Sequence, residues 1–99
     1  MSYNVSNLIN NNGNAAANQF VINTGKATYF QSYDSVVAKI ENGKVTVSSY
    51  WDYSNTTRKH LYIFLSDYGF GRFCSAKEMR KAIESGEVIM VNVSSLNIG

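Results

Sequence analysis

The sequence contains no proline, one cysteine and one histidine, and 16% of its residues are charged. A single cysteine excludes a scaffold of disulfide bonds. With one histidine and seven scattered carboxylates beside it, the chain has too few converging ligands for a zinc site, so we expect no metal and no other cofactor. No stretch approaches the ~20 apolar residues of a membrane span, and the first ten residues lack the basic and apolar segments of a secretion signal. We expect a cytoplasmic protein without membrane contact.

Apolar residues make up 44% of the 99 residues, which is enough for one core. A chain of this length buries roughly 65% of its extended-chain surface, so a second independent domain is excluded. Seven of the first eighteen residues are asparagine, whose side chain bonds its own backbone in turns. The composition therefore predicts an irregular arm over residues 1–18, followed by a single domain over residues 19–99.

Strand patterns occupy the first half of that domain. Alternating residues over 19–23 and β-forming residues over 28–33 predict one hairpin. Asn42-Gly43 supplies the two positive-φ residues of a type I′ turn and predicts a second hairpin, in which Glu41 pairs with Lys44. This register places an apolar set on one face: Val36, Ala38, Ile40, Val45 and Val47.

Helix signals follow in the second half. Ser54 can cap a helix over residues 54–67, and the capping box from Ser75 to Glu78 opens another over residues 75–85. Residues 87–93 are apolar on both faces, as in an interior strand. The order β-β-β-β-α-α-β predicts an α+β domain, with a mainly antiparallel sheet of four to five strands and two helices packed on one face.

No constellation for covalent, metal or phosphate-loop chemistry is present, so we expect a non-enzymatic protein without catalytic residues. His60 and Cys74 could form a base and nucleophile pair. However, Cys74 occupies the hydrophobic-staple position before the second predicted helix, and His60 lies on the shoulder of the first. Asp34, Asp52 and Asp67 each stand beside predicted turns or caps, and local backbone capping explains all three.

Aromatic residues crowd the ends of the predicted strands. Neighbouring residues of a strand point to opposite faces, so one of each adjacent aromatic pair must leave the main core. Such residues either form a second small core under the Asn-rich arm or lie on a surface that binds a protein or stacks single-stranded bases. The candidate partner-binding residues are Tyr29, Tyr33, Tyr50, Trp51 and Tyr53, with Trp51 or Tyr53 as the anchor.

Basic residues cluster between positions 58 and 81, a segment that contains six basic residues and two acidic residues. They form either the solvated faces of two helices or a surface for an anion or nucleic acid. The candidate nucleic-acid residues are Arg58, Lys59, Arg72, Lys77, Arg80 and Lys81. Because they include no dense arginine run and no helix-turn-helix spacing, we favour a protein partner over nucleic acid. Residues 1–25 and 88–99 carry no charge, which leaves strand edges unprotected and makes a homodimer plausible.

Several short motifs resemble a group of small uncharacterised proteins of bacteriophages and other mobile elements. The motifs are Gly13-Asn14, Asn18-Gln19-Phe20, Tyr29-Phe-Gln-Ser-Tyr33 with Ser35, and Trp51-Asp-Tyr-Ser54 with Thr56-Thr57. The similarity spans most of residues 10–65 and brings no established chemistry. It implies an accessory protein in the host cytoplasm that binds and modulates or inhibits a host or defence protein, as anti-CRISPR proteins do. The slightly basic charge argues against mimicry of DNA.

Overall fold

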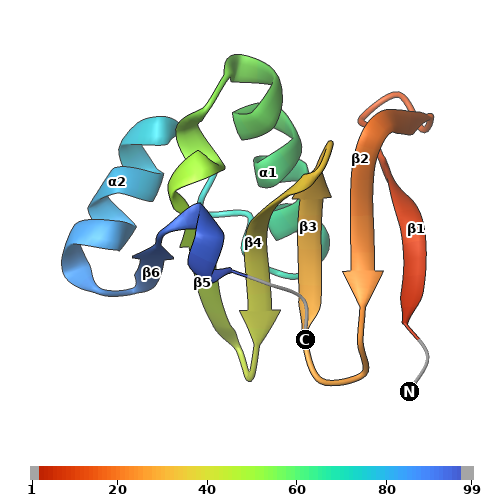
Figure 1. Cartoon of the computed structure of the whole chain (residues 1–99). Coiled ribbons are helices and arrows are strands. Elements are labelled where there is room, and N and C mark those ends of the chain that lie inside the picture. The colour runs from red at the N-terminus through yellow and green to blue at the C-terminus, as the bar shows by residue number, and fades with distance from the viewer. Residues whose placement is uncertain (1–2, 97–99) are drawn as a thin grey trace.

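The computed structural model describes residues 3–96 and shows an α+β fold, in which two helices cover one face of a six-stranded mixed sheet (Figure 1). The strands are β1 (Asn4–Ile9), β2 (Ala15–Asn23), β3 (Thr28–Ser32), β4 (Ser35–Glu41), β5 (Lys44–Ser48) and β6 (Val88–Val91). The helices are α1 (Asn55–Asp67) and α2 (Ala76–Ser85), with short 3-10 helices η1 (Ser49–Asp52) and η2 (Val93–Ser95). The α+β class is as predicted, but the sheet has six strands where four to five were expected.

The strands lie in the sheet in chain order. β1 to β5 are antiparallel neighbours, as expected for strands joined by short turns. β6 pairs in parallel with β5, and the chain reaches it through η1, α1 and α2. A parallel pair requires such a crossover, and this one places both helices on the same face.

The N-terminal segment corrects the prediction of an irregular arm over residues 1–18. Within the described part, it forms β1 and the start of β2. In the connection between β1 and β2, Asn10 Oδ1 accepts hydrogen bonds from the amides of Asn12 and Asn14, both at 3.0 Å, as expected of asparagine in a turn. In β1, pairing with β2 and burial of Leu8 in the main core override the turn preference of the asparagines. Asn7 instead donates across the hairpin to the Ala16 carbonyl at 3.1 Å.

The hairpin of β4 and β5 has the predicted register, with Glu41 opposite Lys44 and Ala38 opposite Val47. Its turn residues Asn42 and Gly43 have φ of +55° and +74°. Val36 departs from the prediction, because the register between β3 and β4 shifts near the start of β4. Such a bulge reverses the alternation of side chains before it. Val37 therefore takes the place in the main core that was predicted for Val36, which packs on the opposite face of the sheet.

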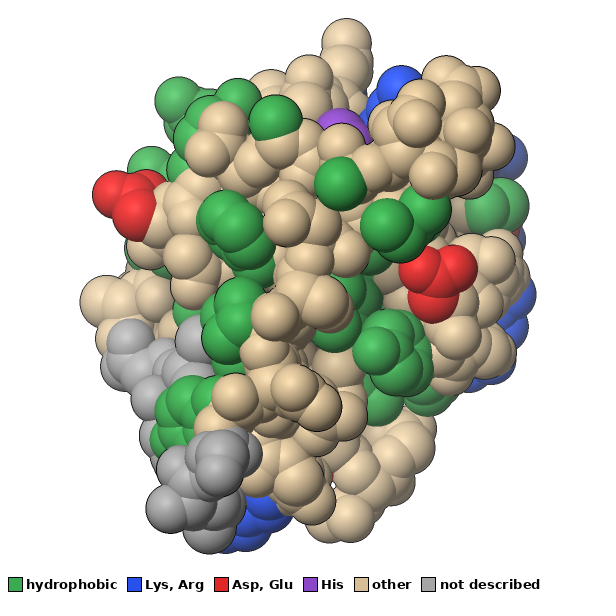
Figure 2. Space-filling model, turned by 90° about the vertical axis from the view of Figure 1, so that its right-hand side faces the viewer, with side chains coloured by type: hydrophobic (Ala, Val, Ile, Leu, Met, Phe, Trp, Pro, Cys, Tyr) green, Lys and Arg blue, Asp and Glu red, His purple; other side chains and the backbone are tan. Residues whose placement is uncertain are grey.

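β6 corrects the prediction of an interior strand. It is an edge strand in which Val88 is buried, whereas Ile89 and Met90 are exposed. The two-sided apolar pattern fails as a sign of burial here because, in the described residues, the helices cover one face and no strand lies beyond β6. β1, the opposite edge, faces the viewer in Figure 2, where charged side chains are few. Neither edge strand contains a charged residue, and self-association through them stays a prediction.

Both helices begin at the predicted caps. Ser54 Oγ accepts from the Thr57 amide at 3.1 Å, and Ser75 Oγ accepts from the Glu78 amide at 3.2 Å. Among the described residues, Glu78 does not return a bond to the Ser75 amide, so half of the predicted capping box forms. Gly86 ends α2 with φ of +84°, a conformation that glycine adopts without steric strain.

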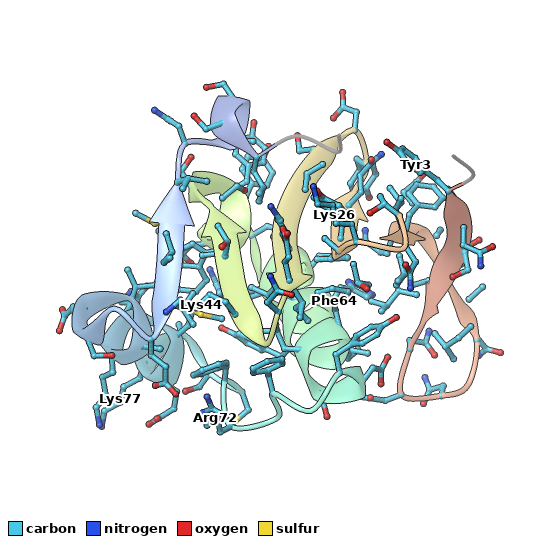
Figure 3. The ribbon with its side chains drawn as sticks, turned by 90° about the horizontal axis from the view of Figure 1, so that it is seen from below. Tyr3, Lys26, Lys44, Phe64, Arg72 and Lys77 are labelled. Atoms are coloured by element: carbon cyan, nitrogen blue, oxygen red, sulfur yellow. The ribbon has the colours of Figure 1, made fainter. Side chains whose placement is uncertain are left out.

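Apolar side chains pack on both faces of the sheet. On the helix side, Phe64 of α1 points toward the sheet (Figure 3) and stacks on Phe30 of β3, with ring centroids 5.6 Å apart. On the other side, Tyr29 packs in a small cluster with Ile22, Ala27 and Val36. The adjacent pair Tyr29 and Phe30 therefore faces two separate cores, as strand alternation predicts.

Candidate functional site

The five candidate partner-binding residues separate into three exposed and two buried side chains. Tyr33, Tyr50 and Tyr53 are exposed, Tyr53 with 70% of its surface accessible. Trp51 is 4% exposed and packs in the main core, and Tyr29 is buried in the small cluster. Of the two expected anchors, Trp51 or Tyr53, Trp51 is buried and does not reach the surface, and Tyr53 is the exposed candidate for that role.

The three exposed tyrosines line one groove of about 460 Å³. It lies between the β3–β4 turn, which carries Tyr33, and the segment from η1 to the start of α1, which carries Tyr50 and Tyr53. We call it the tyrosine groove. Its other lining residues are mostly hydroxyl side chains: Ser32, Asp34, Ser35, Val37, Ser54, Thr56 and Thr57. The volume lies within the range of about 300–1,000 Å³ that is typical of ligand sites.

The 3-10 geometry of η1 explains how Tyr50 and Tyr53 come together. Side chains three residues apart eclipse one another in a 3-10 helix. The two rings stack with centroids 4.9 Å apart and an interplanar angle of 8°. Ser48 Oγ accepts from the Tyr50 amide at 3.2 Å, and the Tyr53 amide donates to the Tyr50 carbonyl at 3.0 Å. Trp51, one residue further on than Tyr50, turns into the core.

Tyr33 adopts an uncommon backbone conformation, with φ of +56°. A bulky residue in this left-handed region costs about 1–3 kcal/mol and persists only when its surroundings fix it. Its amide donates to the Asn18 carbonyl at 2.7 Å, and its own carbonyl accepts from Gln31 Nε2 at 2.7 Å. Strained residues of this kind concentrate at binding sites, and here the strained residue carries an exposed aromatic ring that lines the groove.

Asp52 joins three elements, η1, α1 and α2. Its carboxylate accepts hydrogen bonds from Arg58 of α1 and, at 3.2 Å, from Arg80 of α2, whose guanidinium lies 5.8 Å from the centre of the Trp51 ring. Burial alone would raise the pKa of the Asp52 carboxyl, but the bonds from Arg58 and Arg80 outweigh it and hold the pKa below its ordinary value. Asp52 thus acts as a bridge between the helices and η1 instead of as a local cap.

The lowered pKa of Asp52 predicts an acid-sensitive contribution to stability. A group whose folded pKa is depressed stabilises the fold above its unfolded pKa and loses that effect as the pH falls through the folded pKa. We expect Asp52→Asn to lower the free energy of unfolding by roughly 1 kcal/mol or less at pH 7, because the carboxylate is partly exposed. The difference in free energy of unfolding between wild type and Asp52→Asn should become smaller when the pH falls below the ordinary carboxyl pKa of 3.8.

Urea unfolding of both proteins from pH 7 to pH 2 measures this gap. Asp67→Asn is the matched control, because Asp67 is exposed and forms no ion pair within residues 3–96. A gap for Asp52→Asn that stays constant across this pH range would contradict the role given to the bridge.

The six basic candidates do not gather at one site. Arg58 and Lys59 line a groove of about 500 Å³ beside Cys74, whereas Arg72 and Lys81 line a separate groove of about 280 Å³. Figure 3 shows Arg72 in the connection between the helices and Lys77 on α2. The three arginines are engaged within the protein: Arg58 and Arg80 with Asp52, and Arg72 with Glu87 at 2.6 Å and over the Phe73 ring at 4.5 Å.

The remaining candidates for chemistry are also placed apart. His60 Nδ1 lies 2.8 Å from the Thr56 carbonyl, and His60 does not line the groove that contains Cys74. Cys74 is exposed, not packed as a staple. Across residues 3–96, no three His, Cys, Asp or Glu side chains are grouped so that they could hold a metal ion. In the same range, none of the helices has the length and apolar character to span a membrane.

The sequence did not single out Asp34 or the hydroxyl side chains of the groove. Asp34 was interpreted as a turn cap, yet it is exposed and forms no hydrogen bond within the described range. The available signal was Asp34 directly after the strand predicted over residues 28–33, which places a carboxylate beside the aromatic ring of Tyr33 at a turn. Nothing in this stretch of sequence indicates that the segment from η1 to the start of α1 lies across the groove from it.

A family model described as a family of unknown function, DUF8033, matches residues 3–83. The match includes all three tyrosines of the groove and both helices except the end of α2. Neither the curated proteins nor the solved structures gave a match. Because the matched residues make up most of the chain, the protein belongs to this family of unknown function.

Proposed function

We propose that the protein is a non-enzymatic binding module that docks a protein partner through the tyrosine groove. The observation that carries the proposal is the exposure of Tyr33, Tyr50 and Tyr53 around one groove. Tyrosine offers a large rigid contact area with little rotamer entropy to lose, and such residues supply much of the energy of protein interfaces. Hydrogen bonds fix the backbone of Tyr33 in its turn, and the Tyr50 and Tyr53 rings support each other by stacking before a partner arrives.

Charge favours a protein over nucleic acid as the occupant. Nucleic-acid binding depends on Lys and Arg side chains that neutralise phosphates. Among the described residues, the groove is lined by no Lys or Arg, and Asp34 would repel a phosphate. The expectation that the partner is a host or defence protein draws its support from the sequence resemblance to phage proteins and stays a prediction.

Replacing Tyr53 by serine should remove partner binding with little effect on folding, because the side chain is 70% exposed. The loss of an interface aromatic should weaken binding by about tenfold or more. The measurement is quantitative capture from a lysate of cells that make the protein, with and without nuclease treatment, and with wild type, Tyr53→Ser and Tyr3→Ser as baits. Tyr3 is the matched control, since it is an exposed tyrosine outside the groove.

Proteins retained by wild type and Tyr3→Ser but lost from Tyr53→Ser support the proposal. Circular dichroism of each bait confirms that all three are folded. Equal capture by all three baits, or capture that disappears with nuclease treatment, contradicts the proposal that the tyrosine groove docks a protein.

A further inference from the structure

One charged side chain lines the tyrosine groove in the part of the chain that the structure describes, and it is Asp34. Its carboxylate is exposed and forms no ion pair or hydrogen bond with residues 3–96. Asp52 and Glu87 behave differently, since each accepts from arginine. Asp34 therefore keeps the full accepting capacity of an ionised carboxylate, which suits a bidentate guanidinium.

The aromatic faces around Asp34 are open to the same kind of group. The face of an aromatic ring attracts Lys and Arg within about 6 Å of its centre. The protein uses this contact elsewhere, with Lys39 over Tyr29 at 5.9 Å and Arg72 over Phe73 at 4.5 Å. No Lys or Arg of residues 3–96 lies over Tyr33, Tyr50 or Tyr53 in this way. Tyr50 and Tyr53 cover one face of each other, so each ring has its other face left to receive a cation from another molecule, and no Lys or Arg covers Tyr33.

Hydroxyl groups provide further acceptors beside the rings. Ser54 Oγ and Thr57 Oγ1 lie 3.0 Å apart and cap α1. By contrast, the side chains of Ser32, Ser35 and Thr56 line the groove and form no hydrogen bond with other described residues. A guanidinium group carries five N–H donors, so one carboxylate leaves some of them to be satisfied by neighbouring hydroxyls.

From this combination we infer that the tyrosine groove binds a cationic side chain of the partner, of which arginine fits best. The inference rests on the proposed function and specifies the chemistry of the docked segment. The carboxylate of Asp34 supplies the opposite charge, the rings of Tyr33 and Tyr53 supply flat faces on which a planar guanidinium stacks, and the hydroxyls accept its remaining donors. Lysine satisfies the charge but lacks the planar fork.

The test is a titration of the isotope-labelled full chain with N-acetyl-arginine methylamide, followed by amide chemical shifts. The matching citrulline compound, which has the same shape without the charge, is the control probe. We expect saturable shifts in residues 32–35 and 50–57, with the arginine compound bound about tenfold more tightly than the citrulline compound. Asp34→Asn should weaken arginine binding about fivefold or more, whereas Asp67→Asn, at the far end of α1, should leave it unchanged.

Equal binding of the two compounds, shifts confined to other parts of the molecule, or an unchanged affinity in Asp34→Asn would overturn the inference. Capture with the Asp34→Asn bait separates it from the proposed function. If Tyr53→Ser loses the partner and Asp34→Asn retains it, the groove is a docking site but not one for a cation. If neither variant loses the partner, the proposed function fails, and the titration still decides whether the groove takes a cation.

Discussion

Phe64→Ala is expected to lower the free energy of unfolding by about 3–5 kcal/mol, the range found for buried aromatic residues cut to alanine. Phe64 is fully buried between α1 and the sheet, where its ring stacks on Phe30. Removing it leaves a cavity beneath the helix that rigid neighbours fill only in part. Because native domains are stable by about 5–15 kcal/mol, this loss is a large share of the total.

Urea unfolding followed by circular dichroism measures the effect. Tyr68→Ala serves as the control, because its ring contacts Phe64 at a centroid distance of 5.2 Å but is exposed at the end of α1. We expect about 1 kcal/mol or less for the control. Equal losses for the two variants would mean that α1 does not pack on β3 as described.

Leu8→Ala is expected to destabilise the protein by about 2–4 kcal/mol, whereas Ile9→Ala should change stability by about 0.5 kcal/mol or less. The two residues are neighbours in β1, but Leu8 is 1% exposed in the main core and Ile9 is 49% exposed. The comparison asks whether the Asn-rich N-terminal segment is an integral strand. Two small and equal effects would indicate the irregular arm that composition predicts.

Local signals predicted the elements that local chemistry controls. Ser54 and Ser75 start the two helices, and Asn42-Gly43 sets the register of the β4–β5 hairpin, each through bonds made within a few residues. The bulge that turns Val37 instead of Val36 into the main core depends on how β4 pairs with β3. No residue of β4 indicates this bulge in the sequence. β1 was missed because its asparagines have low strand propensity and because its stability comes from pairing and from Leu8.

The candidate site was predicted in part for a related reason. The sequence identified Tyr33, Tyr50 and Tyr53 among five aromatic candidates. Strand alternation predicted that Tyr50 and Trp51 would point to different sides, and they do so, although they lie in a 3-10 helix and not in a strand. It could not decide which of the two is buried, because that depends on where η1 lies relative to the helices. Asp34 acquires its place in the groove from the η1–α1 segment opposite, which is distant in the sequence.

The parallel pairing of β5 with β6 also has a consequence for the order of folding during synthesis. β1 to β5 are joined by short turns, so their pairing closes small loops and can follow the chain as it leaves the ribosome. β6 becomes available after both helices have been made, and its pairing closes the longest loop between neighbouring strands of the sheet. Until then, the backbone of β5 is an open edge, with its apolar residues Val45 and Val47 only partly covered. The nascent chain is therefore most exposed to wrong pairing in the interval between the completion of β5 and the arrival of β6.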